Sequence, residues 1–241
     1  MGTTFMFICI ILVASVLQTS TGFGFSIMAT PFLLMLFSPQ EAIQINIILS
    51  LIISISLIWK IRTDVDFILL KRLAIGSIVG VPFGILLFVS IDINIFKLAV
   101  SILLLILTVM LICNFKVKST QSRDFVVGGV SGLLTTSIGM PGPPLLLYFT
   151  GTDVKKEKLR ATTLAFYLFI YFVSLITQIF FTGTNKLIWE SSLYAIPIVF
   201  LGLFLGQIIF KWLSQRFFRI FTYVLLSCTG MYLLIESLKV L

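Results

Sequence analysis

Eight stretches of this chain contain no Asp, Glu, Lys or Arg, and every charged residue lies between them or at the C-terminus. A helix needs about 20 apolar residues to cross a bilayer. With flanking residues included, six of the stretches predict single transmembrane helices: 42–59, 73–91, 98–113, 161–181, 191–210 and 220–235.

The other two apolar stretches are interrupted. Stretch 5–37 would be about 50 Å long as one straight helix, and it contains glycines and Pro31. Stretch 125–149 is rich in glycine and proline, and its Met140–Pro144 segment cannot be helix interior because proline removes an amide donor and clashes with the preceding turn. We therefore expect a re-entrant or broken-helix hairpin in each stretch, with breaks at 19–24 and 136–144.

The basic residues predict the topology. Fourteen of the 17 Lys and Arg residues fall in loops 60–72, 116–123, 155–160 and 211–219, and such loops face the cytoplasm. If 125–149 crossed the membrane once, one cluster would lie outside. If 125–149 enters and returns, all four clusters are cytoplasmic. We favour the second topology, which gives two inverted halves and places both termini outside.

Two parts of the sequence match each other at a nearly constant offset. Leu17–Gly22 resembles Leu134–Gly139, 117 residues later. The Gly80/Gly84 pair matches Gly202/Gly206, and this small-xxx-small spacing favours close helix packing. The predicted fold is an all-α integral membrane protein with one transmembrane domain, 1–241. Its two inverted repeats, about 1–115 and about 120–241, each have a hairpin and three transmembrane helices.

Matched interrupted helices are the best sequence pointer to a transporter's substrate site. Helix N-termini at the breaks present free amide donors and partial positive charge, which suits an anion, and hydroxyl side chains add donors. The expected substrate-binding residues are Gln18, Thr19, Ser20, Thr21, Gly22, Gly24, Asn46, Thr135, Thr136, Ser137, Gly139, Gly142 and Thr163. The alternative is that these small and polar residues serve helix packing. Gln207 is a weaker candidate.

Composition narrows the class of protein. Hydrophobic residues make up 59% and charged residues 11% of the chain, whereas charged residues are about a quarter of a globular sequence. The absence of histidine excludes histidine-based metal sites and triads, and the three unpaired cysteines suit apolar packing. We expect no catalytic residues, no metal and no cofactor. The net charge of +8 indicates orientation in a membrane rather than nucleic-acid binding.

Three segments carry a family resemblance: Gly22–Pro31, Gly139–Pro144 and Ala42–Asn46. Together with the glycine-spaced third helices, they resemble the TauE/SafE sulfite exporter family over essentially the whole chain. The resemblance implies a multi-pass permease of a bacterial or archaeal inner membrane, associated with sulfite, sulfonates and related organic anions. Met140-Pro141 and Pro143 depart from the family pattern, which carries more glycine there, and so leave the substrate open.

The expected function is therefore a secondary permease that exports a small sulfur-containing anion across the cytoplasmic membrane. A passive anion channel, an uptake permease for another small organic anion and a subunit of a larger assembly remain alternatives. The expected partners are the anion and membrane lipids, with a homo-oligomer left open. No carboxylate lies within an apolar stretch, so any ion coupling acts through loop-edge groups such as Glu41 or through the substrate itself.

Overall fold

The computed structural model describes residues 2–90, 93–112, 120–150 and 154–212, and the helical pieces 223–224, 227–228, 230–232 and 234–235. All regular structure in these residues is helical, which confirms the predicted all-α class. The elements are α1 (Gly2–Thr21), α2 (Phe25–Leu33), α3 (Pro39–Ile61), the 3₁₀ turn η1 (Arg62–Asp64), α4 (Phe67–Ser90), α5 (Ile93–Ile112), α6 (Gln121–Ile138), α7 (Gly142–Thr150), α8 (Lys156–Thr182) and α9 (Lys186–Trp212).

Five helices in the described part of the chain are long and apolar enough to cross a membrane: α1, α3 with its 3₁₀ extension, α4, α8 and α9. The last four contain the predicted spans 42–59, 73–91, 161–181 and 191–210, although Ile91 itself is not described. Helix α5 covers 98–112 of the next predicted span. Most of stretch 220–235 lies outside the described residues.

The outer surface is apolar, as expected of a protein in lipid. Phe83 on α4 is 58% exposed and Phe204 on α9 is 64% exposed, and large exposed aliphatic and aromatic side chains cover every long outer helix that is described. Monomeric soluble proteins do not expose contiguous apolar surface on this scale. The described helices therefore form a multi-pass membrane protein.

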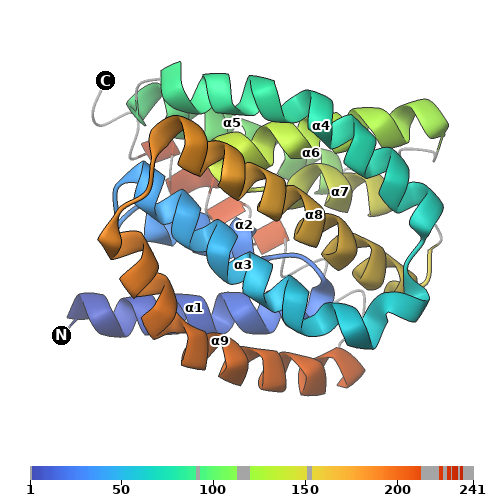
Figure 1. Cartoon of the computed structure of the whole chain (residues 1–241), viewed down its shortest axis with the longest axis horizontal. Coiled ribbons are helices and arrows are strands. Elements are labelled where there is room, and N and C mark those ends of the chain that lie inside the picture. The colour runs from blue at the N-terminus through green and yellow to red at the C-terminus, as the bar shows by residue number, and fades with distance from the viewer. Residues whose placement is uncertain are drawn as a thin grey trace.

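Helices α3 and α8 cross the middle of the molecule (Figure 1). They are also the most buried of the five long helices. In Figure 1, α1 and α9 lie side by side along one side of this central pair, and α4, α5 and α6 lie along the other. Short helices α2 and α7 follow α1 and α6 and pack inside. The polar interior lies around this central pair.

Glycine permits two very close helix contacts. A Cβ on Gly80 of α4 would overlap the carbonyl oxygen of Gly129 on α6, and one on Gly84 would lie 2.5 Å from that of Leu133. Likewise, a Cβ on Gly206 of α9 would lie 2.6 Å from the Cβ of Thr19 on α1. Both predicted glycine pairs therefore serve close packing, α4 against α6 and α9 against α1.

Candidate functional site

The first break lies at Gly22–Gly24, between α1 and α2, inside the predicted 19–24 segment. Gly22 and Gly24 have φ of 81° and 106°, which side chains with a Cβ rarely adopt. The Gly22 N–H donates to the carbonyl of Gln18 at 2.8 Å, and the Phe23 N–H donates to Thr21 Oγ1 at 3.0 Å. A Cβ on Gly22 would lie 3.0 Å from the Cα of Arg160, so this break rests directly on α8.

The second break lies at Gly139–Pro141, between α6 and α7, and is confirmed within the predicted 136–144 segment. Gly139 ends α6 with φ of 70°, and the Nδ2 of Asn46 on α3 donates to its carbonyl at 2.8 Å. Pro143 and Pro144 lie in the first turn of α7 rather than in the break. Proline is tolerated there because first-turn amides have no acceptor within the helix. Pro31 lies inside α2, two residues before its end, and does not break it.

The starts of α2 and α7 are neighbours in the interior. A Cβ on Gly142, the first residue of α7, would lie 3.2 Å from Cδ1 of Ile27 on α2 and 2.8 Å from the hydroxyl of Tyr167 on α8. The same tyrosine ring packs edge-on against Phe23, with centroids 6.4 Å apart. Tyr167 therefore joins the two breaks.

Most hydroxyls expected to contact substrate donate within their own helices. Thr135, Thr136 and Ser137 donate to carbonyls four residues earlier, at 2.5, 3.0 and 2.7 Å. Thr136 Oγ1 also lies 2.8 Å from Ser174 Oγ. Ser20 donates to the carbonyl of Leu17 at 3.2 Å. These protons are already used, so such side chains offer lone pairs rather than donors.

The unused donors lie elsewhere in the same interior. Thr19, Thr163, Tyr167 and Tyr171 are buried, and their hydroxyls have no hydrogen-bond partner in the described structure. The two tyrosine rings stack edge-on, 5.2 Å apart. Tyr171 lies close enough to Ser26 and Ser50 for their hydroxyls to interact with its own, but no hydrogen bond of standard geometry joins the three groups. Buried polar groups are normally satisfied, so the hydroxyls of Tyr167, Tyr171, Ser26 and Ser50 form a hydroxyl cluster with the unfilled bonding capacity of a polar ligand site.

Amide side chains border the hydroxyl cluster. Gln18 Nε2 donates to the Ser50 carbonyl at 3.2 Å and to Ser54 Oγ at 3.4 Å, which ties α1 to α3. Gln178 Nε2 donates to the Thr136 carbonyl at 2.7 Å. The side-chain oxygens of Gln18, Gln178 and Asn46 are buried without a partner. Gln207 instead lies toward the surface, where it accepts from Lys60 at 2.5 Å.

Arg160 is a buried cation at the first break. It belongs to a basic loop that the sequence interpretation assigned to orientation, yet only 7% of the residue is exposed. Its guanidinium carbon lies 4.2 Å from the ring centroid of Phe210 on α9, a cation–π contact. Its Nε and one terminal nitrogen, Nη2, are buried without a hydrogen-bond partner in the described residues. Burial of an unpaired charge is costly.

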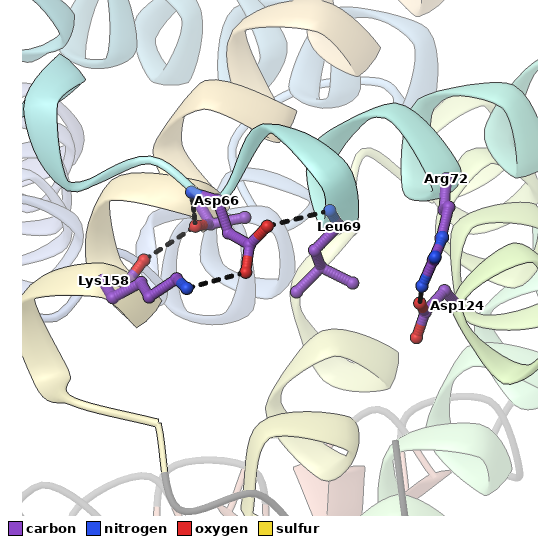
Figure 2. Close-up of polar contacts among 6 residues, drawn as sticks. Asp66, Leu69, Arg72, Asp124 and Lys158 are labelled. Atoms are coloured by element: carbon purple, nitrogen blue, oxygen red, sulfur yellow. Dashed lines mark hydrogen bonds and ion pairs between the residues drawn. The ribbon is translucent and has the colours of Figure 1, made fainter. Parts of the chain in front are cut away.

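A second buried charge joins α4, α6 and α7. Asp124, just before the 125–149 stretch, is 1% exposed, and its carboxylate accepts from Arg72 Nη1 at 3.0 Å and from the hydroxyl of Tyr148. Figure 2 shows the Arg72–Asp124 pair beside the first turns of α4. Asp124 thus lies outside every apolar stretch of the sequence and is nevertheless buried in the folded chain.

Asp66 is also more than a solvated loop charge. Its carboxylate accepts from the Leu69 N–H at 3.1 Å, which caps α4, and lies 2.9 Å from Lys158 Nζ (Figure 2). Partial burial acts to raise its pKa, but the hydrogen bonds and charge of Lys158 outweigh this effect and hold the pKa below its usual value of 3.8. Asp66 thus fixes the entry of α4 against α8.

Among the expected contact residues, the structure gathers Gln18–Thr21, Gly22 and Gly24 at the first break. Thr135–Ser137, Gly139, Gly142 and Asn46 lie at the second. Thr163 is buried on α8, one turn from Arg160. Sequence reasoning missed Arg160, Tyr167, Tyr171, Ser26 and Ser50. The signal available was a pair of tyrosines four residues apart in the charge-free stretch 161–181, because buried tyrosine hydroxyls need partners.

No group of three or more Cys, Asp or Glu side chains that could hold a metal ion occurs in the described part of the chain. The unfilled capacity is instead that of neutral hydroxyls, amides and one guanidinium, which can replace the hydration shell of a small polar solute. Long apolar helices, two broken hairpins and this polar interior define a multi-pass α-helical membrane protein of transporter type.

The family comparison agrees with that class. The model of the sulfite exporter TauE/SafE family matches residues 7–233, so the chain belongs to this family of membrane transporters. The resemblance deduced from the glycine and proline motifs is confirmed. No curated protein and no solved structure gives a match to the chain.

Proposed function

We propose that this protein is a secondary permease that moves a small sulfur-containing anion, such as sulfite or an organosulfonate, out of a prokaryotic cell across the cytoplasmic membrane. The observation that carries the proposal is the meeting of α2 and α7 at their N-terminal turns, beside the unpartnered hydroxyl of Tyr167. First-turn amides have no acceptor within their helix. Together with buried hydroxyls they offer an anion many donors in a water-poor interior.

The proposed architecture is a pair of inverted repeats, and contacts that exchange the halves support it. Gly22 rests on Arg160, and Gly139 rests on Ile43. Both sets of positions are related by the same offset, 117 residues. In the first contact a glycine of the first half packs against the second half, and in the second contact the equivalent glycine of the second half packs against the first half. A two-fold relation between the repeats requires such a reciprocal pair.

The glycine packing follows the same rule. A Cβ on Gly84 would lie 2.9 Å from the Cβ of Thr136, and one on Gly206 would lie 2.6 Å from that of Thr19. The glycines are 122 residues apart and the threonines 117. In the proposed mechanism the two halves rock about the site between the hairpins, and access alternates between the faces of the membrane.

Counterflow in proteoliposomes tests the function. Vesicles preloaded with unlabelled sulfite or a small organosulfonate should take up labelled substrate faster than empty vesicles, because a carrier shows trans-stimulation. Equal uptake into loaded and empty vesicles would identify a passive channel. The topology has its own test: single cysteines placed in loops 116–123 and 155–160 should react from the cytoplasmic face only. Labelling of the two loops from opposite faces would exclude the inverted arrangement.

Tyr167→Phe tests the site, because it removes one buried hydroxyl and leaves the ring that packs against Phe23 and Tyr171. Loss of one neutral hydrogen bond of about 1–1.5 kcal/mol should reduce transport roughly tenfold. The matched control is Tyr194→Phe on α9, where the tyrosine is 76% exposed. If both variants transport at the wild-type rate, Tyr167 does not contact the substrate.

A further inference from the structure

The guanidinium of Arg160 stands out among the charged groups because it combines deep burial with no counter-charge. The residue is 7% exposed, and it forms no ion pair with any carboxylate in the described residues. A second charged group over the Phe210 ring is also a cation, Lys156, whose Nζ lies 5.1 Å from the ring centroid. A buried charge without a partner is normally neutralised by something else.

The stereochemistry of the unpartnered atoms indicates what that partner is. Nε–H and Nη2–H point from the same edge of a guanidinium, and this edge binds two oxygens of one oxyanion side by side. These are the two buried nitrogens without a partner. The face of the group is already occupied by Phe210. The unoccupied part of the guanidinium is therefore the planar edge with the two donors Nε–H and Nη2–H, called the fork below. Such an edge suits a sulfonate, sulfite or carboxylate group.

Position links this fork to the proposed transport site. The backbone and Cγ of Arg160 line the space beside Gly22, where a Cβ would lie 3.0 Å from Cα and 3.2 Å from Cγ. Gly22 leads through Gly24 into the first turn of α2. Unpartnered Thr163 lies one turn further along α8, and Tyr167 one turn beyond it. The cation therefore lies at one end of the row of unused hydroxyls on α8.

Only one half supplies this charge. The position related to Arg160 by the 117-residue offset is Ile43, which packs against Gly139 with Cγ2 at 3.3 Å from a Cβ built there. At the second break the polar contact is the neutral amide of Asn46. The two breaks are thus electrostatically unequal: one is cationic and the other is neutral.

From these observations we propose that Arg160 binds the oxyanion head of the transported solute through its Nε–Nη2 edge. Because Arg160 is the one buried cation that the described residues place at this break and Lys156 is partly exposed, the site selects a monoanion whose remainder is neutral, an organosulfonate type, over a dianion such as sulfate. This inference rests on the proposed function and specifies its substrate class. The same fork would fit the phosphate of an anionic lipid head group, so the experiment separates the two sources.

The experiment measures binding of methanesulfonate and sulfate to purified full-length protein in nanodiscs of neutral lipid. Arg160→Gln should weaken sulfonate binding about 100-fold, since it removes a bidentate charged pair. Arg160→Lys keeps the charge but not the fork, and should weaken binding about tenfold. The matched control is Arg62→Gln, because Arg62 is exposed and contacts the Trp59 ring at 5.2 Å. This control should bind like wild type.

If the Arg160→Lys protein and a folded Arg160→Gln protein both bind methanesulfonate as tightly as the wild-type protein does, Arg160 does not bind the oxyanion. Counterflow by the wild-type protein would still support the permease in that case. If Arg160→Gln does not fold, Arg160→Lys alone decides. Equal wild-type affinity for sulfate and methanesulfonate would overturn the monoanion selection. If the variants lose only bound phosphatidylglycerol, detected by native mass spectrometry, and keep sulfonate binding, the fork is a lipid site and the proposal is wrong. Absence of any anion transport by wild-type protein would instead refute the permease.

Discussion

Gly84→Ala is expected to force α4 and α6 apart. The new Cβ would lie 2.5 Å from the carbonyl oxygen of Leu133, 0.9 Å short of the 3.4 Å at which ordinary contact begins. The opposing atom belongs to helix backbone, so it cannot rotate away. An opening of 0.5–1 Å removes about a quarter to a half of the dispersion energy of each contact along the interface.

The same interface contains a matched control. A Cβ on Gly129 would meet nothing closer than the carbonyl oxygen of Gly76 at 3.4 Å, so Gly129→Ala fits without movement. Both variants gain about 1 kcal/mol of helix propensity, but only Gly84→Ala incurs an overpacking cost of about 1–3 kcal/mol. Gly84→Ala should therefore be less stable than Gly129→Ala by about that amount.

Thermal unfolding in detergent, followed by fluorescence-detected size exclusion, measures this difference. At about 2–4 °C per kcal/mol for a chain of this size, Gly84→Ala should melt about 2–12 °C below Gly129→Ala. Gly206→Ala should resemble Gly84→Ala, because its Cβ would lie 2.6 Å from Thr19 Cβ and 2.8 Å from the Val16 carbonyl. A Gly84→Ala protein that melts at or above the Gly129→Ala protein would refute the packing argument.

Two further predictions concern charges. Asp124→Asn leaves Arg72 without its ion-pair partner and should lower the free energy of unfolding by about 3 kcal/mol. This value is the lower end of the range for a broken buried ion pair, because Arg72 is partly exposed. The control, Glu190→Gln at an exposed ion pair, should change the free energy of unfolding by less than about 0.5 kcal/mol. Equal melting temperatures for these two variants would contradict this. For Asp66, whose pKa is held below 3.8, the stabilising pair with Lys158 persists above that pH and weakens as the pH falls through the lowered pKa. The melting-temperature difference between wild type and Asp66→Asn should therefore be constant from pH 7 to about 5 and shrink below about 4; a difference that grows on acidification would show the sign to be wrong.

The interruptions in the two hairpins could be predicted from the sequence because their causes are local. Glycine at positive φ and proline without an amide proton act within a few residues, so Gly22, Gly24 and Gly139 mark the breaks directly. Close packing at Gly80 and Gly84 was predictable for a similar reason, since small residues four apart form one flat helix face. The partner helices, α6 and α1, were not specified by that spacing.

The polar site was only partly predictable. The burial of Arg160 depends on α9 bringing Phe210 over it, and the burial of Asp124 depends on Arg72 from another helix. Such pairings depend on the tertiary structure. The local sequence around a charged residue at the edge of an apolar stretch does not distinguish a solvent-exposed side chain from a buried one. The sequence predicts that the hydroxyls of Thr135 and Ser137 donate to the substrate, whereas both donate to carbonyls of their own helix. Thr and Ser side chains commonly form such local bonds.

The pairing of α1 with α9 has a consequence for how the protein is made. Helix α1 is synthesised before α9, and about 165 residues separate its end from the start of α9. At 5–20 residues per second, α1 waits roughly 10–30 s for this neighbour. During that time Thr19, against which Gly206 finally packs, has no α9 to cover it. Until α9 is made, the polar end of α1 therefore has to be covered either by the insertion machinery or by α3, whose Ser50 carbonyl accepts from Gln18.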